Sequence, residues 1–305
     1  MNTFDLTNLI KNKSQKLGFN LVGVTSPHII KNNLLDKWID KKYHASMSWM
    51  ENRMEERKDI FKYFPEVKSI ISFGYNYYTG QNKLDNKNFK ISNYAWGEDY
   101  HLVIKKKLFL IIEDLKNIYP DLKFRVCVDT SPVSEKYWGE QAGLGWIGKH
   151  TNLINNNMGS WFFLSEILLD VELDYDDPFL KDLCGNCTKC IDKCPTSALD
   201  EYVLDSNKCI SYLTIEHRGE INENFHDKLD GWIYGCDICQ QVCPWNIKFS
   251  LQSEDQSFVK RKKIKDMDNE KWENLSIKQY REIFKKSAIK RTKFEGIKRN
   301  IKLNK

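Results

Sequence analysis

The amino-acid sequence predicts an α+β protein whose first part mixes helices with strands and whose second part is rich in cysteine. Two observations lead to this class. Amphipathic helical segments alternate with short buried strands up to about residue 175, and eight of the nine cysteines then fall between positions 184 and 243. With 305 residues, of which 41% are apolar and 29% charged, the chain is long enough for a sizeable core and for two domains.

The elements of the first part follow from hydrophobic periodicity. Helices are predicted over 3–17, 100–118 and 135–141, and buried strands over 67–78, 124–128 and 160–173. Gly18 and Gly143 end the first and third helices, and Pro120 prevents the second from continuing. The polar residues 81–93 predict a loop. Cys127 falls within the strand FRVCV, where a buried structural cysteine is the expected role.

Composition divides the chain into three ranges. DYDDPF at 174–179 marks a boundary, so we expect a mixed domain over 1–175, a cysteine-rich domain over 176–250 and a basic segment over 251–305. Residues 256–305 contain 17 Lys and Arg against 6 Asp and Glu, a net charge of +11, and the other residues carry −6. Such a segment favours a polyanionic partner, although a solvated helical surface is the alternative. NLSIKQYREIFKK within it carries a short helical pattern.

The sequence contains neither an export signal nor a membrane span that we can identify. The first residues, MNTFDLTNLIKNKSQ, lack a continuous apolar stretch, and the apolar run LFLIIEDL at 108–115 is too short to cross a bilayer. Clustered cysteines in C-x-x-C spacing favour metal ligation in a reducing compartment over disulfides. We therefore expect a cytoplasmic protein without a membrane partner, and nothing requires more than a monomer.

The cysteine spacing predicts two [4Fe–4S] clusters in a ferredoxin-like domain. CGNCTKCIDKCP at 184–195 matches the C-x2-C-x2-C-x3-C-P run, in which the last cysteine ligates the other cluster, and CDICQQVCP follows at 236–244. The predicted ligand sets are Cys184, Cys187, Cys190 and Cys243 for one cluster, and Cys194, Cys209, Cys236 and Cys239 for the other. Two structural zinc sites are the alternative, but zinc does not explain the crossed pattern.

Two neighbouring clusters conduct single electrons, so an acceptor site is expected within the first 175 residues. No G-x-G-x-x-G follows a strand, and GLGWIGKH at 143–150 favours a tight turn over a phosphate loop. Asp99 and His101 begin a D-x-H-x-x-G cobalamin motif, but Ile104 replaces its glycine, so a histidine-ligated cobalamin is not supported. Asp129, at a strand end, can donate a proton if its pKa is raised; a turn or N-cap aspartate is the alternative.

Several motifs in order resemble the epoxyqueuosine reductase family. They are VDTSPVSEK, AGLGWIGKHTNLI, GSWFFLSEILL, CGNCTKCIDKCPTSAL and CDICQQVCPWN, with YAWGEDYH at 94–101 and IKRTKFEGIKRN at 289–300. The resemblance extends from about residue 15 to 300. Many members continue into a C-terminal helical-repeat region, whereas this sequence ends at Lys305. The resemblance implies a cobalamin bound by an N-terminal α/β domain, with the two clusters beside it.

The resemblance also implies an activity and a set of site residues. The family reduces epoxyqueuosine to queuosine at the wobble position of tRNA, with electrons passed from the clusters to cobalamin and a proton from Asp129. Residues expected to line cobalamin are Arg57, Gly97, Asp129, His150 and Ser160, and those expected near the cofactor or the RNA are Ser211, Thr214, Glu216 and Arg218. Without the resemblance, surface or packing roles are the simpler interpretation of most of these residues. The basic segment would contact tRNA phosphates.

Three other functions remain open from the sequence. A cobalamin-dependent reductive dehalogenase-like enzyme would act on a small substrate and would not need the basic segment. A ferredoxin-like electron carrier would leave the first 175 residues without a role. A nucleic-acid-binding protein with structural clusters would show no chemistry on cluster reduction. Under every redox reading, the electron donor is unidentified.

Overall fold

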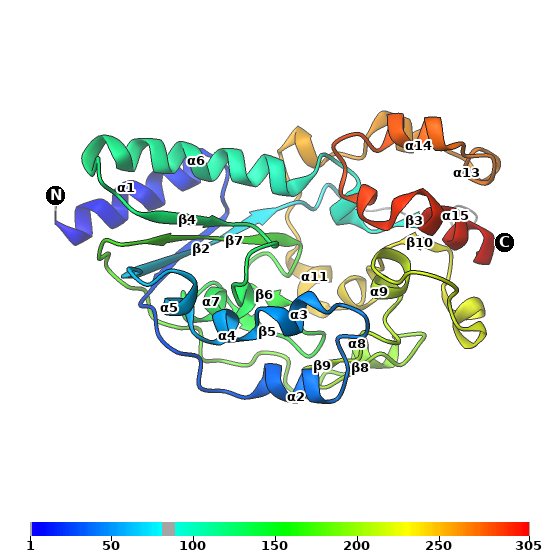
Figure 1. Ribbon diagram of the computed structural model, residues 1–305, viewed down its shortest axis with the longest axis horizontal. Helices are drawn as coiled ribbons and strands as arrows, with labels where there is room; N and C mark the ends of the chain where they lie inside the picture. The colour runs from blue at the N-terminus through cyan, green and yellow to red at the C-terminus, as the bar shows by residue number, and fades with distance from the viewer. Residues whose placement is uncertain (1, 81–88, 305) are drawn as a thin grey trace.

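A four-stranded sheet forms the centre of the computed structural model, which describes residues 2–80 and 89–304 (Figure 1). The strand order is β1 (Leu21–Thr25), β2 (Ser69–Asn76), β7 (Phe162–Leu169) and β4 (Phe124–Cys127). Neighbouring strands of this sheet pair antiparallel, and β7 pairs with β2 along its whole length. The predicted mixed fold class and the three predicted strands are confirmed; β1 was not predicted.

Two long helices cover one face of the sheet (Figure 1). α1 (Thr3–Lys16) and α6 (Tyr100–Ile118) pack their apolar sides on the strands, and together they form a large core. Asn2 and Asp99 cap the two helices through side-chain oxygens. Both predicted helices are confirmed. Of the helices in the described part of the chain, none is long and apolar enough to span a membrane.

Shorter elements cover the opposite face. α7 (Glu135–Gln141) confirms the predicted helix and lies against β2 and β7. The other elements on this side are α2 (Leu34–Asp40), α3 (Trp49–Asn52), α4 (Met54–Lys58), α5 (Ile60–Tyr63) and the hairpin of β5 (Trp146–Ile147) and β6 (Leu153–Ile154). Cys127 is buried beside Trp138 in an apolar cluster, and burial raises the pKa of its thiol to about 12. Its predicted structural role is confirmed.

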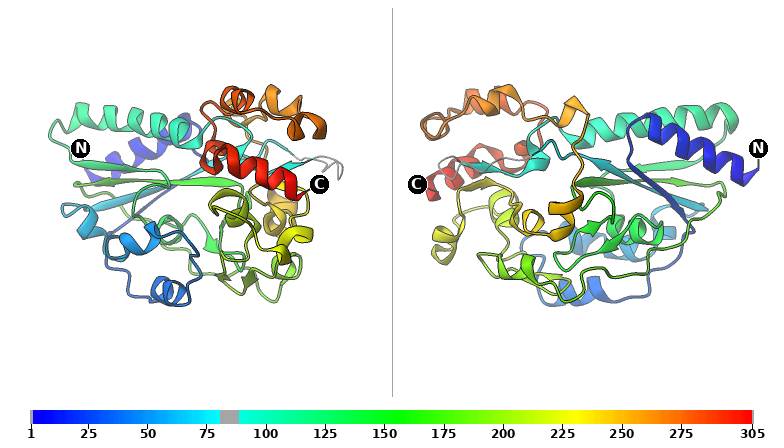
Figure 2. Two further views of the ribbon diagram at one scale, coloured as in Figure 1. Left: turned by 45° about the vertical axis from the view of Figure 1, so that its right-hand side comes forward. Right: turned by 180° about the vertical axis from the view of Figure 1, so that it is seen from behind.

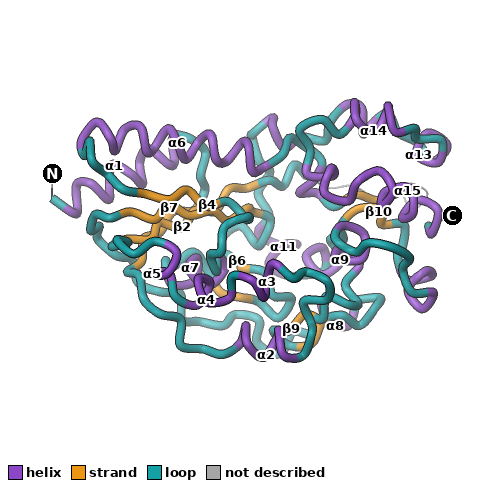
Figure 3. The backbone as a smooth tube through the Cα atoms, in the orientation of Figure 1, coloured by secondary structure: helices purple, strands orange, loops and turns teal. Residues whose placement is uncertain are grey.

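The cysteine-rich region consists largely of loops joined by short elements (Figure 3). These are α8 (Lys189–Asp192), β8 (Leu199–Asp200), β9 (Val203–Leu204), α9 (Ile210–Ile215), η2 (Glu223–Lys228), β10 (Trp232–Tyr234), α10 (Ile238–Gln241) and α11 (Pro244–Phe249). Pro244 begins α11 directly after Cys243, at the position in a helix that proline tolerates best. Helices this short are not stable alone, so tertiary contacts and the cysteines must hold the region.

The basic segment folds onto the body of the protein (Figure 2). Its elements are η3 (Gln256–Phe258), α12 (Lys262–Lys265), α13 (Asn269–Glu273), α14 (Ile277–Ile283), η4 (Ala288–Thr292) and α15 (Lys293–Leu303). The apolar sides of α12 to α15 and η4 share one core with Trp96 from the first range and Ile233 from the cysteine-rich range, whereas Phe258 of η3 packs into the core of the sheet. Asn300 is buried there and donates to the carbonyls of Thr214 and Ile233, each at 2.8 Å. The three predicted ranges thus pack together, and the division between them stays a prediction.

One predicted loop contains regular structure. Of residues 81–93, positions 81–88 lie outside the described residues. β3 (Lys90–Ile91) then pairs in parallel with β10, and η1 (Asn93–Ala95) follows. The loop prediction is wrong for these positions because the partner strand lies far along the sequence and leaves no local pattern.

Candidate functional site

Asp129 lies just beyond β4, where the chain turns toward α7 with a left-handed backbone. Its φ is +59°, a conformation that is costly for a residue other than glycine and that clusters at functional sites. The side chain is 58% exposed. Its Oδ2 atom accepts hydrogen bonds from the Tyr100 hydroxyl at 2.9 Å and from Nε2 of His101 at 3.1 Å. The predicted proton donor is therefore held by two residues of α6.

His101 connects two carboxylates at the start of α6. Its Nδ1 lies 2.7 Å from Oδ1 of Asp99, and its Nε2 faces Asp129. The Tyr100 ring stacks on the His101 ring at 4.0 Å and on the Phe163 ring at 4.2 Å, which holds it against β7. Burial would lower the pKa of His101, but the hydrogen bonds and charges of the two carboxylates outweigh it and raise the pKa to about 9. His101 is thus an imidazolium at neutral pH.

The same contacts act in the opposite direction on Asp129. Partial desolvation by the surrounding protein would raise the pKa of this carboxyl, but the hydrogen bond and charge of His101, with the hydrogen bond from Tyr100, lower the pKa below its usual value. At neutral pH the proton of the pair therefore lies on the imidazole. The condition under which the sequence makes Asp129 a proton donor, a raised pKa, is not met by the carboxyl alone.

Two further acids lie near Asp129, and the sequence analysis missed both. The Asp129 backbone N–H donates to Oε1 of Glu135 at 2.7 Å, and burial followed by the charge of Asp129 raises the pKa of Glu135 to about 8. Glu166 in β7 is fully buried, and its two carboxyl oxygens have no hydrogen-bond partner among the described residues. Burial, then the nearby Glu135, raises the pKa of Glu166 well above its ordinary value. Both residues fall within motifs of the family resemblance, VDTSPVSEK and GSWFFLSEILL, but only the fold shows that the two acids lie close to Asp129.

Arg57 and His150, both expected to line cobalamin, carry buried nitrogen atoms in need of a partner. Neither Nε of Arg57 nor Nε2 of His150 is hydrogen-bonded within the part of the chain that the structure describes. The Asn152 backbone N–H donates to Nδ1 of His150 at 3.2 Å, so the ring proton lies on Nε2. Burial, then the charge of Lys136, lowers the pKa of His150 to about 4. Buried donors are normally satisfied, so a bound group with polar atoms fits here.

Ser160 and Gly97 have contacts that join the sheet region to later segments. The Ser160 hydroxyl accepts hydrogen bonds from Nε2 of Gln240 at 3.0 Å and from Nδ2 of Asn246 at 2.9 Å. A methyl group added to Gly97 would lie 2.1 Å from the carbonyl oxygen of Ser257. These contacts give both residues a packing role, and their contact with cobalamin stays a prediction.

The residues expected near the cofactor or the RNA after Cys209 contact the C-terminal segment. The Thr214 hydroxyl is buried and accepts from the Gly235 N–H at 2.9 Å, and the Ser211 carbonyl accepts from Thr214 at 3.4 Å. Glu216 pairs with Arg291 at 2.7 Å, and Arg218 donates to the Arg291 carbonyl at 2.9 Å. These contacts agree with the packing alternative, and the binding role of the group stays a prediction.

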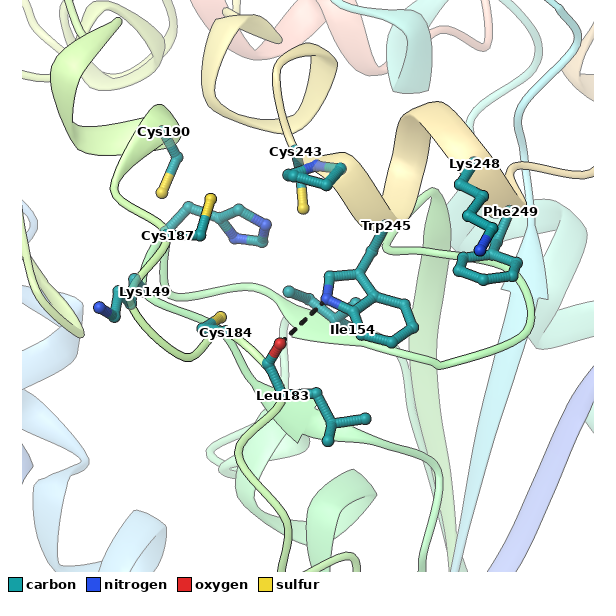
Figure 4. Close-up of a pocket in the computed structure, with 12 residues that line it drawn as sticks. Lys149, Ile154, Leu183, Cys184, Cys187, Cys190, Cys243, Trp245, Lys248 and Phe249 are labelled. Atoms are coloured by element: carbon teal, nitrogen blue, oxygen red, sulfur yellow. Dashed lines mark hydrogen bonds between the residues drawn. The ribbon is translucent and has the colours of Figure 1, made fainter.

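Four cysteines from two distant segments face one cavity (Figure 4). The set is Cys184, Cys187, Cys190 and Cys243. Their sulfur atoms border a hollow of about 330 Å³, which His150 and Trp245 also line. Four thiolates around one hollow fit a four-iron cube, which is the group that the crossed cysteine spacing predicts. The Trp146 indole donates to the Cys184 sulfur at 3.5 Å.

The other four cysteines of the region influence one another. The set is Cys194, Cys209, Cys236 and Cys239. Burial raises the pKa values of Cys209, Cys236 and Cys239, and thiols of the same set add to each rise. Cys190 of the first set also contributes at Cys239, so the two sets adjoin. Thiols that oppose one another's ionisation in this way become stable ligands when bound metal neutralises them.

Comparison with known proteins gives the family. Residues 183–246 match the model of the "4Fe-4S double cluster binding domain", and residues 57–130 match "Epoxyqueuosine reductase QueG, DUF1730". An epoxyqueuosine reductase of Cyclobacterium marinum is 43% identical over 299 residues, which cover 97% of this chain and 95% of that protein. The chain belongs to the epoxyqueuosine reductase family. A family member of Leadbetterella byssophila is 42% identical, with 97% of each chain covered.

Solved structures of epoxyqueuosine reductases agree with this assignment. The structure with a tRNA-Tyr epoxyqueuosine-modified stem loop has a TM-score of 0.89 at 26% identity, covering 99% of this chain and 81% of that one. The Bacillus subtilis enzyme gives the same score and identity, with 82% of that chain covered. A B12-dependent reductive dehalogenase, at 16% identity and a TM-score of 0.51, shares the fold alone. The predicted family, its oxidoreductase class and the double-cluster domain are confirmed.

Proposed function

We propose that this protein reduces epoxyqueuosine to queuosine at the wobble position of tRNA. The observation that carries the proposal is a proton-holding pair, His101 and Asp129, close to cysteines arranged for electron transfer. Lys136 of α7 lies within electrostatic reach of both Asp129 and Cys239, which supports this proximity. Among solved relatives, one holds an epoxyqueuosine-modified stem loop, and another has its aspartate catalytic loop swung out of the active site. We assign that catalytic role to Asp129.

The reaction requires two electrons and two protons. Both carbon–oxygen bonds of the epoxide break, an alkene forms between the two carbons, and the oxygen leaves as water. Cobalamin, when bound, supplies the strongly reducing, nucleophilic metal centre that this chemistry needs. We propose that Arg57 and His150 hold it, because their unpartnered N–H groups can meet the amide side chains of a corrin. Gly97 and Ser160 are assigned to the same surface from the family resemblance.

The side chains of this protein position the substrate oxygen and handle its proton. Because Asp129 is 58% exposed, an epoxide oxygen can reach its carboxyl from the open side. Transfer of a proton to that oxygen neutralises the charge that develops as the carbon–oxygen bond breaks. Glu135 lies behind Asp129 and, with a pKa of about 8, adds little negative charge at neutral pH. It also fixes the Asp129 backbone through one hydrogen bond.

We assign the eight cysteines to the two clusters in crossed sets. The first is held by Cys184, Cys187, Cys190 and Cys243, and the second by Cys194, Cys209, Cys236 and Cys239. The shared cavity supports the first set, and the mutual effects on the thiol pKa values support the second. Adjoining sets would let electrons pass from one cluster to the other.

The basic segment is the surface that we assign to the tRNA. Lys286 is exposed, and its carbonyl accepts the Asp99 N–H at 3.0 Å, so this part of the segment adjoins the start of α6. The Arg291 guanidinium stacks over the exposed Trp49 ring at 4.9 Å, which offers an aromatic surface for an unstacked base. Lysine and arginine contacts to phosphate make such binding weaken with salt. Ser211, Thr214 and Arg218 support this surface from behind.

The remaining assignments concern organisation. We take residues 1–175 as the cobalamin-binding range, 176–250 as the two-cluster range and 251–305 as the tRNA-binding range. We further infer a cytoplasmic monomer, because tRNA and iron–sulfur clusters both belong to a reducing compartment. A separate redox protein must supply the electrons, since this chain carries no motif for a nicotinamide cofactor.

Anaerobic reconstitution tests the function. The protein should contain about eight irons per chain, bind cobalamin with a corrinoid spectrum, and convert an epoxyqueuosine-bearing anticodon stem loop. Asp129→Asn should lower single-turnover conversion by about 10²- to 10⁴-fold, because the amide cannot donate an acidic proton. Asp121→Asn, at an exposed turn, is the matched control. Full conversion by Asp129→Asn would remove the assigned proton donor, and failure to bind the corrin would overturn the function.

A further inference from the structure

We propose that His101 is the positioning residue that loads Asp129 with its proton, and that Asp99 holds the imidazole in place for this transfer. The inference rests on the proposed function and adds a second and third residue to the same site. Asp99, His101 and Asp129 form one hydrogen-bonded chain, and the substrate oxygen would lie at its Asp129 end.

The geometry leaves the imidazole with one carboxylate on each ring nitrogen. Nδ1 is 2.7 Å from Asp99, and Nε2 is 3.1 Å from Asp129. Asp99 is itself fixed, because its Oδ1 accepts the His101 backbone N–H at 3.2 Å as the N-cap of α6. Stacking of Tyr100 on the ring fixes its plane. A proton on Nε2 therefore points at the Asp129 carboxylate.

His101 lies in the first turn of α6, where a positive charge is unfavourable unless other groups stabilise it. The N-terminus of the 19-residue helix α6 carries a positive dipole end, which disfavours a cation in its first turn. A purely structural histidine at this place would be expected to be neutral. The hydrogen bonds and charges of the two carboxylates outweigh the burial, and the pKa of His101 rises to about 9. The arrangement stores a proton beside Asp129 at neutral pH.

Charged and titratable groups from the surrounding elements face the chain of three residues. They are Arg57 from α4, Tyr94 from η1, Tyr100 from α6, Glu135 and Lys136 from α7, Tyr234 from β10, Arg261 at the start of α12, and Lys290 and Arg291 from η4. The positive charges of Lys290 and Arg291 lower the pKa values of Asp99 and Asp129 respectively and so favour their ionised forms. The proton therefore stays on the imidazole until the substrate oxygen accepts it.

One proton moves from His101 through Asp129 to the substrate oxygen. As a carbon–oxygen bond of the epoxide breaks, the proton on His101 Nε2 passes to the Asp129 carboxylate, and Asp129 gives it to the substrate oxygen. Asp129 therefore begins and ends the step ionised. The imidazolium becomes neutral imidazole, and the substrate gains one O–H bond. The two electrons come through the clusters as in the proposed reaction, and solvent supplies the second proton and recharges His101.

His101→Gln separates this role from a structural one. The glutamine amide can still donate to Asp129, but it cannot hold a mobile proton. With pre-reduced holoenzyme and a modified stem loop, the wild-type single-turnover rate should fall as the pH rises through about 9. In the variant, the rate at pH 7.5 should drop about 10²-fold, and the falling limb should move below about pH 5, where the carboxyl must be protonated from water. His226→Gln is the matched control, since this histidine of η2 contacts only the backbone carbonyl of Ile221 among the hydrogen bonds of the described residues.

Two further measurements make the outcome decisive. Asp99→Asn keeps a good N-cap but removes the negative charge that faces Nδ1 of His101. The fall of the single-turnover rate with pH should therefore lie between those of the wild type and His101→Gln. Labelling the six histidines with ¹³C at Cε1 should reveal one that titrates near pH 9 in the holoenzyme and is missing in His101→Gln. An unchanged limb in His101→Gln, or a His101 that titrates near 6.5, would overturn the inference. Loss of conversion in the wild type would instead overturn the proposed function.

Discussion

The sheet region and the cysteine-rich region lie side by side in this protein but are built in different ways. In the sheet region, the 19-residue α6 and the eight-residue β7 pack into a continuous apolar core. In the cysteine-rich region, the described helices and strands reach at most six residues, and several buried groups are thiols with raised pKa values. Hydrophobic burial stabilises the first region, whereas the second depends on ligands that neutralise its sulfur atoms.

Because the two regions are stabilised differently, they also contribute to function in different ways. Asp129 follows the edge strand β4 and is held by His101 of α6, which packs on the sheet, so this proton-holding pair is built from residues of the sheet region alone. The cysteine sets acquire their role only with iron. Three substitutions test how far the two regions are independent, and they are ordered here by the size of the expected effect.

Cys243→Ser should break the cysteine-rich region and leave the sheet intact. Serine is a poor ligand for iron, so one cluster should be lost and the iron content should fall from about eight to about four per chain. Conversion of the stem loop should become undetectable because the electron path is cut. Cys127→Ser is the matched control: Cys127 is buried in the sheet region, outside both sets. Iron and sulfide analysis with electron paramagnetic resonance reads the result, and iron loss in the control would contradict the assignment.

Gly97→Ala should loosen the junction between the sheet region and the C-terminal segment. The added methyl group would lie 2.1 Å from the Ser257 carbonyl oxygen and 2.5 Å from Cα of Phe258, so backbone must move. Overpacking of this kind costs about 1–3 kcal/mol or more of the free energy of unfolding. Chemical denaturation measures it. Glu98→Ala is the control, because this exposed neighbour keeps its backbone hydrogen bond to Ser257. Equal stability of the two variants would refute a tight junction.

Glu135→Gln should reveal the cost of an acid buried behind the site. Burial raises the pKa of Glu135 from 4.5 to about 8, so the folded state takes up a proton. Its contribution to stability is complete below about pH 4.5 and is lost as the pH rises to about 8. The variant lacks this loss, so relative to wild type it should gain about 2–3 kcal/mol between pH 6 and pH 9. Urea unfolding at both pH values measures the difference, and a pH-independent difference would contradict the assigned pKa.

Local patterns were sufficient for the regular elements of the sheet region. The helices over 100–118 and 135–141 agree with α6 and α7 to the residue, since apolar spacing and flanking proline or glycine specify a helix locally. β1 was missed because five residues with a glycine carry little periodicity. β3 was missed because its partner is β10, far along the sequence.

The site also combines residues that the sequence predicts with contacts that appear only in the folded protein. Local sequence was enough to predict the two-cluster domain and to propose a grouping of its eight cysteines, because thiolate spacing is set by the reach of the chain around a cube. It also singled out Asp129 through a family motif. Only the tertiary structure decided that His101 and Glu135 meet Asp129, that Gly97 touches the C-terminal segment, and that the proton lies on an imidazole. The physical reason is that pKa values depend on charges and burial contributed by several separate elements, which no local pattern records.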